Sequence, residues 1–321
     1  MAIFHFSVKI ISRGKGQSAI AAAAYRSGQK LTDEQAGETK HYRARSQRII
    51  FEGVFAPKDA PAWAHDRQQL WNEVERRESR GQGMRPEKAQ LAREIELALP
   101  HELTDQQREW LVKDFVREQF VRKGFAVDMA IHAPDKGGDA RNHHAHIMVT
   151  LRQVGENGFA ATKDRSQSTK AQLGSWRQEW EKLANRHLAR HGHAARIDRR
   201  SLKAQGIERE PQIHVGVAAK GMQARGVLPV SKIVTAPKTG GSTPRKINYP
   251  AIDNGQTRAQ ANEAIILRNH GWHMPQSLIQ IKLRPAPSKA PEAKPAKLWI
   301  AARSIAHRRP VREPQGLEQE R

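Results

Sequence analysis

The chain has 321 residues, of which 38% are hydrophobic, and this length suits one large domain or two ordinary ones with a buried core. It carries 55 Lys and Arg against 33 Asp and Glu, and the resulting net charge of +22 is typical of proteins that bind a polyanion such as nucleic acid. The absence of cysteine excludes disulfides and thiolate metal sites, and the absence of a long apolar run or a signal-peptide pattern predicts a cytoplasmic protein without a membrane span.

The first segment of the chain has the pattern of a strand, because apolar and polar side chains alternate over residues 3–11. A basic turn with two glycines follows over 12–17 and includes Lys15. The alanine-rich stretch 18–28 favours a helix, and Gly28 fits its C-terminal stop. A strand and a short helix are therefore predicted here, joined by a basic turn.

Tyr25 lies near the end of this predicted helix and is one of only three tyrosines in the chain. A tyrosine can act as a covalent nucleophile, although a single tyrosine is more simply explained as a packing residue. Arg26 follows it and a basic turn precedes the helix, so this end of the helix could receive a phosphodiester. A further basic run, 40–45 with Arg43, is either DNA-facing or a solvated loop, and residues 196–202 form another basic element.

The middle of the chain alternates predicted strands and helices. Strand patterns cover 48–55 and 93–100, and amphipathic helical patterns cover 63–80 and 104–123. In the second of these strands, Glu94 and Glu96 lie on the face opposite the apolar residues. They are either solvent-facing residues or groups that orient histidine ligands by accepting a ring N–H.

Three histidines occur within four positions at the start of a strand pattern over 144–151. On a strand, His144 and His146 share one face, while the other face is apolar. The preceding strand pattern, 125–132, ends in His132, and the Pro-, Gly- and Asp-containing loop between them predicts a hairpin. Antiparallel pairing would bring the three imidazoles together. A lone histidine is usually structural, but this set is suited to a divalent transition ion.

These patterns predict an α+β fold, in which helices back an antiparallel sheet and the polar strand faces converge on its open front. A last amphipathic helix is predicted over 170–191. Beyond about residue 227 the composition becomes basic and proline-rich, and eleven of the 17 prolines fall at or after Pro229. One folded domain is therefore predicted over 1–216, followed by a basic, largely disordered tail over 217–321.

Four stretches together make the chain resemble the MobA/MobL family of relaxases, the strand-nicking enzymes of mobilisable plasmids. They are 7–9 with 13–14 and 21–28, then 92–100, then His132 with 142–146, and finally 196–201 with 205–206 and 211–216. The resemblance covers roughly residues 1–216, and its motifs are specific because they occur in the family's order. It implies a histidine-hydrophobic-histidine nuclease fold, with the catalytic domain over this range.

The resemblance also implies roles for individual residues. Tyr25 would be the nucleophile, with Glu94 and Glu96 as supporting acidic residues. His132, His144 and His146 would hold a divalent metal ion, either Mg²⁺ or Mn²⁺, with Zn²⁺ as an alternative. Candidate DNA contacts, chosen for their charge and position, are Lys15, Arg26, Arg43, Arg196, Arg199 and Arg200.

The activity that this implies is site- and strand-specific nicking at a transfer origin, for the conjugative mobilisation of a plasmid. Attack by Tyr25 would give a 5′-phosphotyrosine intermediate. The expected partners are single-stranded and supercoiled DNA at the origin, accessory mobilisation proteins and a secretion coupling protein. Two alternatives stay open: a metal-dependent nuclease that uses water, and a non-catalytic origin-binding protein with a structural metal site.

Overall fold

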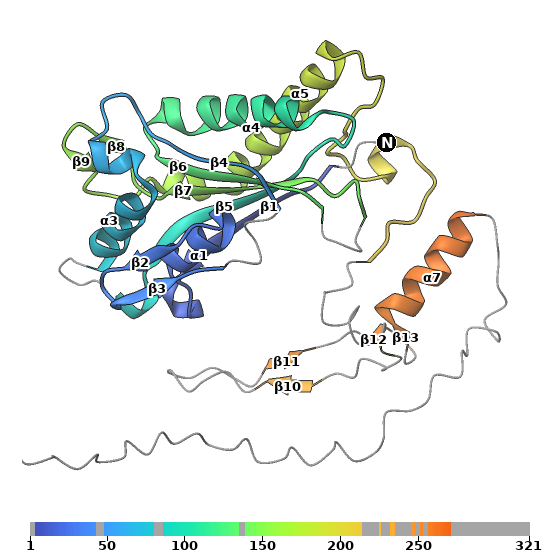
Figure 1. Cartoon of the computed structure of the whole chain (residues 1–321). Coiled ribbons are helices and arrows are strands. Elements are labelled where there is room, and N and C mark those ends of the chain that lie inside the picture. Colours follow the sequence, from blue (N-terminus) through green and yellow to red (C-terminus); the bar gives the residue numbers. More distant parts are fainter. Residues whose placement is uncertain are drawn as a thin grey trace, which may run out of the picture. The chain divides into compact units, whose positions relative to one another are not determined.

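The computed structural model describes residues 4–42, 48–79, 86–134, 139–213, 225, 232–234, 245–247, 251–252 and 256–270. The chain divides into two compact units, Met1–Ser201 and Leu202–Arg321. The first unit is built on an antiparallel sheet with helices on both faces (Figure 1). Within the described ranges, no helix combines the length and apolar character that crossing a membrane requires.

The sheet has five strands in the order β1-β5-β7-β6-β4, and every neighbouring pair is antiparallel. Their bounds are Phe6–Ser12 for β1, Ile49–Phe55 for β4, Gln90–Ala98 for β5, Val127–His132 for β6 and His144–Thr150 for β7. All five predicted strands are present. The two histidine strands lie side by side, and β7 is the central strand, so their apolar faces are buried in the middle of the sheet.

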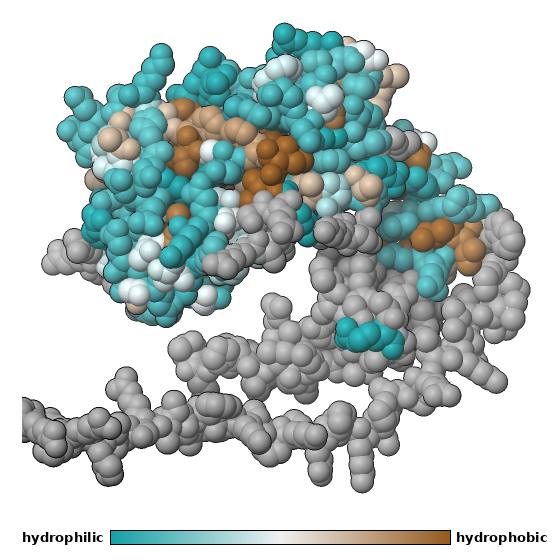
Figure 2. Space-filling view, viewed as in Figure 1, coloured by the Kyte–Doolittle hydropathy of each residue, from teal (hydrophilic) through white to brown (hydrophobic). Residues whose placement is uncertain are grey.

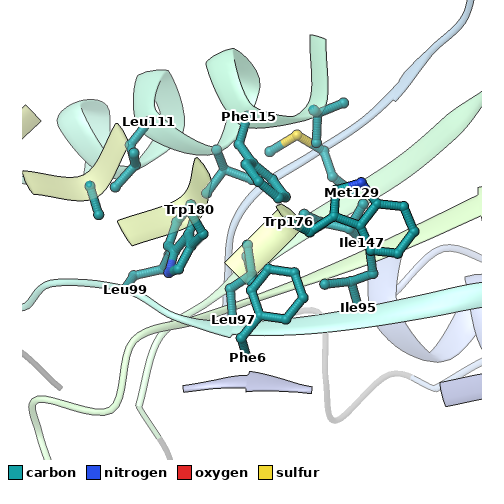
Figure 3. Close-up of a cluster of buried hydrophobic side chains, with 14 of the residues drawn as sticks. Phe6, Ile95, Leu97, Leu99, Leu111, Phe115, Met129, Ile147, Trp176 and Trp180 are labelled. Carbon is teal, nitrogen blue, oxygen red and sulfur yellow. The ribbon is translucent and has the colours of Figure 1, made fainter. Parts of the chain in front are cut away.

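Helices α4 (Asp105–Gln119) and α5 (Lys170–Arg190) cover one face of the sheet and form the main hydrophobic core with it (Figure 1). Figure 3 shows Phe115 of α4 and Trp180 of α5 above the apolar side chains of the strands, and their ring centroids are 5.3 Å apart. Each such side chain removed from water contributes about 1.5–3 kcal/mol. A capping box begins α4, since Thr104 and Gln107 exchange hydrogen bonds at the start of the helix.

The opposite face, which was predicted to be open, is partly covered by α1 (Ala19–Ser27) and α3 (Arg67–Ser79) (Figure 1). Ala19, Ala23 and Ala24 are fully buried, and their small side chains let α1 lie close to its neighbours. The helix ends at Gly28, whose φ of 69° is the left-handed conformation that glycine adopts without strain. This C-terminal end of α1 carries Tyr25 and lies against β6.

A buried ion pair fixes α3 on the same face. Arg67 donates from Nε and Nη2 to the two carboxylate oxygens of Asp128 on β6, at 2.9 Å each. Trp71 of α3 donates from Nε1 to Asp128 at 2.9 Å. Asp128 lies four residues before His132 on β6 and shares its strand face, and α3 covers Asp128 and removes it from water.

Smaller elements complete the described structure. In the first unit they are the hairpins β2 (Leu31–Asp33) with β3 (Glu38–Lys40) and β8 (Val154–Gly155) with β9 (Gly158–Phe159), and the 3₁₀ turns η1 (Arg13–Lys15), η2 (Ala62–His65), η3 (Pro86–Lys88), η4 (Val121–Lys123) and η5 (Arg165–Ser168). In the second they are η6 (Lys203–Gln205), β10 (Lys232–Val234), β11 (Arg245–Ile247), β12 (Ala251–Ile252), β13 (Gln256–Thr257) and α7 (Arg258–Asn269). Most of the predicted disordered tail lies outside the described residues, and the domain boundary after residue 216 stays a prediction.

Hydrophilic side chains cover most of the first unit in the view of Figure 2. This surface is in keeping with a chain in which 27% of the residues are charged and the positive charges are in excess. A basic surface of this kind attracts polyanions over distances longer than a hydrogen bond.

Candidate active site

Three histidines converge on the face of the sheet that α1 partly covers. His132 at the end of β6 is paired with His144 of β7, and His146 lies two residues further along the same strand face. The three ring centroids are 5.1–5.3 Å apart, and one ligand atom from each ring lies within 4.8 Å of the others. The structure thus brings together the imidazoles that the strand pattern placed on one face.

Hydrogen bonds set the tautomers of two of these rings. Nδ1 of His144 lies 3.1 Å from the carbonyl oxygen of Asn142, and Nδ1 of His146 lies 3.2 Å from Oε1 of Glu94. Both partners can only accept, so each ring donates from Nδ1 and carries its lone pair on Nε2. Histidines that bind metals are commonly held in this way by a carbonyl or a carboxylate.

His132 is oriented by a different contact. Its Nε2 lies 2.7 Å from the carbonyl oxygen of Arg26, at the C-terminal end of α1. The carbonyl accepts, so this ring donates from Nε2 and its lone pair is on Nδ1. Three neighbouring imidazoles, each oriented by its own partner, fit a divalent ion that accepts nitrogen ligands.

Glu94 is the acidic residue that contacts the cluster. Burial alone would raise the pKa of its carboxyl, but the hydrogen bond from His146 and the guanidinium of Arg26 outweigh burial and hold the pKa at about 2. Nε of Arg26 donates to Oε1 of Glu94 at 3.0 Å. A carboxylate that stays ionised keeps the ring of His146 fixed.

Glu96 has a different setting although it lies on the same face of β5. It is directly across from His146 in the register, but its carboxylate lies 3.4 Å from Nζ of Lys9 and its side chain is 31% exposed. Lys9 is itself 61% exposed, so this ion pair stands at the open edge of the site. The structure therefore connects Glu94 with the histidines and Glu96 with the solvent-facing edge.

Tyr25 is half-buried on α1, and its ring packs edge-to-face against Tyr42 with centroids 5.4 Å apart. The next residue, Arg26, supplies the carbonyl that contacts His132. Tyr25 is therefore the chain neighbour of a residue that contacts the cluster. The ring contact with Tyr42 has no sequence signal, because Tyr42 follows a short hairpin whose path the residue pattern does not reveal.

The start of α1 is fixed as firmly as its end. Ser18 caps the helix by accepting from the backbone N–H of Ala21. Glu75 of α3, which is 1% exposed, accepts from the backbone N–H of Ala19 at 2.7 Å and from Arg13. Glu75 lies within a strongly charged segment, so only the tertiary structure distinguishes it from the surface glutamates around it.

The six predicted DNA contacts have different settings. Lys15 is exposed in η1, and Arg26 is only 15% exposed and bonded to Glu94. Arg196, Arg199 and Arg200 are exposed beyond the end of α5, where Arg199 pairs with Glu181 and Arg200 with Asp198. Arg43 lies outside the described residues. The contacts with DNA stay predictions.

Several known proteins are similar to this chain. The family model described as "MobA/MobL family" matches residues 17–225. The chain is 35% identical over 288 residues to "Conjugal transfer protein TraA" of Agrobacterium fabrum, and the match covers 78% of this chain and 25% of that protein. It is 37% identical over 254 residues to "Mobilization protein MobL" of Acidithiobacillus ferridurans, and that match covers 70% of this chain and 65% of the relative. The chain therefore spans only part of the length of these relatives.

One similar solved structure is described as "Molecular Basis of Vancomycin Resistance Transfer in Staphylococcus aureus". It shares 31% sequence identity with this chain, and the two superpose with a TM-score of 0.55. The match covers 62% of this chain and 100% of that one. This likeness confirms the predicted class of fold, an antiparallel sheet flanked by helices.

Proposed function

The chain belongs to the MobA/MobL family, and from this premise we propose that it nicks one DNA strand at a transfer origin through a covalent bond to Tyr25. The observation that carries the proposal is the meeting of α1 with the histidines. The carbonyl of Arg26, next to Tyr25, lies 2.7 Å from Nε2 of His132, and His144 and His146 complete the cluster. The names of the relatives, which concern mobilisation and conjugal transfer, support the same process.

In this proposal His132, His144 and His146 hold a divalent ion. When bound, the ion supplies positive charge that neutralises the oxygens of the scissile phosphate and aligns it for in-line attack. Mg²⁺ prefers oxygen ligands, whereas imidazoles suit transition ions. We therefore expect Mn²⁺ and Zn²⁺ to bind more tightly than Mg²⁺, whichever ion serves in the cell.

The chemistry of the chain itself is a transesterification. The phenolic oxygen of Tyr25 forms a bond to phosphorus while the bond from phosphorus to the 3′ oxygen breaks, and the phenol proton passes to water. The products are a 5′-phosphotyrosine and a 3′ oxygen that takes up a proton. Because one phosphodiester replaces another, the strand can later be rejoined by the reverse reaction. An unperturbed tyrosine has a pKa of about 10, so attack requires the positive surroundings of the site.

The DNA partner would be the single strand next to the nick, within a supercoiled origin. A strand of this kind is held by positive charge along its backbone. Lys15, Arg196, Arg199 and Arg200 are exposed and suited to that task. Accessory mobilisation proteins and a secretion coupling protein are the proposed protein partners.

The test uses the full chain, Mn²⁺ and a supercoiled plasmid that carries its own transfer origin. We expect relaxation of the plasmid and, on a denaturing gel, a protein–DNA adduct that peptide mapping assigns to Tyr25. Tyr25→Phe should abolish the adduct. Tyr42→Phe is the matched control, because it removes the neighbouring hydroxyl and keeps the ring contact, and it should still form the adduct.

The outcomes separate the alternatives. Cleavage that persists in Tyr25→Phe without any adduct would identify a nuclease that uses water. DNA binding without cleavage under every metal would identify an origin-binding protein. An adduct that is lost in Tyr42→Phe and kept in Tyr25→Phe would move the nucleophile to the other tyrosine.

A further inference from the structure

Arg26 links the helix that carries Tyr25 to two of the three clustered histidines. We infer that Arg26 is a positioning residue for these proposed metal ligands and not a DNA contact. The inference rests on the proposed function, since it concerns the same site. It differs from the prediction made from charge alone, which placed Arg26 on DNA. Two independent contacts carry it, one from the backbone of Arg26 and one from its side chain.

The backbone contact belongs to the last turn of α1. Carbonyls in the last turn of a helix lack an intrahelical N–H partner and need another donor. The carbonyl of Arg26 obtains one from Nε2 of His132 at 2.7 Å. Gly28 then turns the chain away with a φ of 69°, so the helix ends against β6. One hydrogen bond thus ties the residue next to Tyr25 to one histidine of the cluster.

The side chain uses all three of its nitrogens within the protein. Nε and Nη2 contact Oε1 of Glu94, at 3.0 and 2.5 Å, and Nη1 donates to the carbonyl of Ala22 at 2.7 Å. Oε1 of Glu94 in turn lies 3.2 Å from Nδ1 of His146. A continuous series of contacts therefore runs from the body of α1 through Arg26 and Glu94 to the second histidine.

Burial shows why this arrangement suits positioning better than DNA binding. The side chains of Arg26, Glu94 and His146 are 15%, 9% and 14% exposed. A guanidinium in this setting has little surface left for a phosphate, and its charge is matched by the carboxylate. Without Arg26, Glu94 would be a buried carboxylate with one partner fewer, and it would hold the ring of His146 less firmly.

The first test measures Mn²⁺ binding by calorimetry in the full-length chain, a readout that does not depend on activity. Removal of a group that orients a metal ligand typically weakens binding by about 10–100-fold, so we expect Arg26→Gln to lose affinity in that range. Arg26→Lys should be intermediate, because an ammonium can reach Glu94 but cannot replace the planar fork. Lys30→Gln removes an exposed charge just beyond α1 and is the matched control, with affinity changed by less than about twofold.

A double-mutant cycle shows whether Arg26 acts through Glu94. If it does, the Arg26→Gln, Glu94→Gln double variant should bind Mn²⁺ about as well as Glu94→Gln alone, because the second change removes nothing further. A variant that is merely less stable would instead give additive losses. Additive losses, or unchanged Mn²⁺ affinity in both Arg26→Lys and Arg26→Gln, would overturn the inference.

The second test measures binding to a non-cleavable single strand from the origin as salt is raised. Removing one phosphate contact to a single strand lowers the slope of log affinity against log salt by about 0.7. We expect the slope of Arg26→Lys and Arg26→Gln to match that of the wild type. A slope reduced by one phosphate would assign Arg26 to DNA and overturn the inference. An adduct formed by the wild-type chain in the nicking test would still support the proposed function.

Discussion

His143 and His144 are neighbours in the sequence, yet only His144 belongs to the cluster with His132 and His146. The carbonyl of His143 accepts from the backbone N–H of Leu99, which fixes the chain just before β7 begins. Its Nδ1 is buried and finds no hydrogen-bond partner among the described residues. The two histidines therefore offer a test in which the residue type is constant and only membership of the cluster differs.

We predict that His144→Ala weakens Mn²⁺ binding by more than about a hundredfold, since loss of even a partner outside the ligand set costs about 10–100-fold. Adduct formation should disappear with it. His143→Ala is the control and should leave Mn²⁺ binding nearly unchanged, because His143 does not belong to the cluster. Calorimetry with both variants decides the matter, and equal losses would mean that the ligand set has been assigned to the wrong residues.

Two glutamates on one strand face show how far sequence reasoning reaches at this scale. Alternation places Glu94 and Glu96 on the face of the histidines, and both are there. It does not say which one contacts a ring, because that depends on where α1 crosses the sheet. Arg26, which lies on α1 and 68 positions before Glu94 in the chain, donates to Glu94 from its guanidinium. Glu96 accepts from Lys9 instead.

At the scale of elements, α1 is held at its start by a carboxylate from another helix. Glu75 of α3 accepts from the backbone N–H of Ala19 and from the guanidinium of Arg13. Helix N-termini need such partners because their first N–H groups have no intrahelical acceptor. The same helix ends beside His132. A displacement of the start of α1 would therefore also displace Tyr25 and Arg26 relative to the histidines.

We predict that Glu75→Ala lowers the free energy of unfolding by about 1–3 kcal/mol, because it leaves a buried N–H and a guanidinium without their acceptor. The rate of adduct formation should also fall, since Tyr25 is on the loosened helix. Glu73→Ala, on the same helix but paired with Arg76 near the surface, should change stability by less than about 0.5 kcal/mol. Denaturant unfolding of both variants provides the comparison, and equal losses would contradict the anchoring role.

The contact between α4 and α5 should make the stability of the fold depend on pH. His187 is 4% exposed, and Nε2 lies 3.1 Å from Oδ2 of Asp114. Burial lowers the pKa of His187 below its ordinary value, and it prevails over the carboxylate of Asp114, which acts in the opposite direction. The unfolded chain therefore takes up the proton first, at a pH near about 6.5.

The sign of the effect follows from that order. Above a pH of about 6.5 the ring is neutral in both states, and as the pH falls below it the unfolded state gains protons and stability is lost. We predict that the loss of melting temperature between pH 7.5 and pH 5 is smaller in His187→Gln than in the wild type. Identical profiles in His187→Gln and the wild type would contradict the prediction.

The strands could be predicted because apolar and polar side chains alternate along them. Helices α4 and α5 could be predicted because their apolar residues recur at helical spacing. The packing of α3 could not be predicted from the sequence. The segment 63–80 is rich in charge, and the pattern identified only Trp63, Leu70, Trp71 and Val74 as its apolar side, yet Arg67 and Glu75 are buried as well. Asp128, which accepts from Arg67, is 61 positions away, and Ala19, which donates to Glu75, is 56 positions away, so burial of these charges depends on tertiary contacts that local periodicity does not contain.

At the scale of the whole molecule, the excess of positive charge is divided between the two units. Residues 202–321 hold 20 Lys and Arg against 8 Asp and Glu, which is more than half of the net charge of +22. The cluster of histidines, Tyr25 and Glu94 belong to the first unit. The proposed chemistry and much of the proposed electrostatic attraction to DNA are thus assigned to separate parts of the chain.

This division predicts the effect of ending the chain at residue 270. Residues 271–321 hold 10 Lys and Arg against 4 Asp and Glu, so their removal should weaken DNA binding and flatten its dependence on salt. For every phosphate of a single strand that the shortened chain no longer neutralises, the slope of log affinity against log salt should fall by about 0.7. Fluorescence anisotropy with an origin oligonucleotide over a salt series measures both quantities.

At saturating DNA, the rate of adduct formation by the shortened chain should match that of the full chain, because every residue of the site remains. The two measurements together separate attraction to DNA from chemistry, since the first depends on salt and the second is taken where all of the protein is bound. A shortened chain that binds DNA with unchanged affinity and slope, but no longer forms the adduct, would show that the basic C-terminal region acts on the chemistry and not on attraction to DNA.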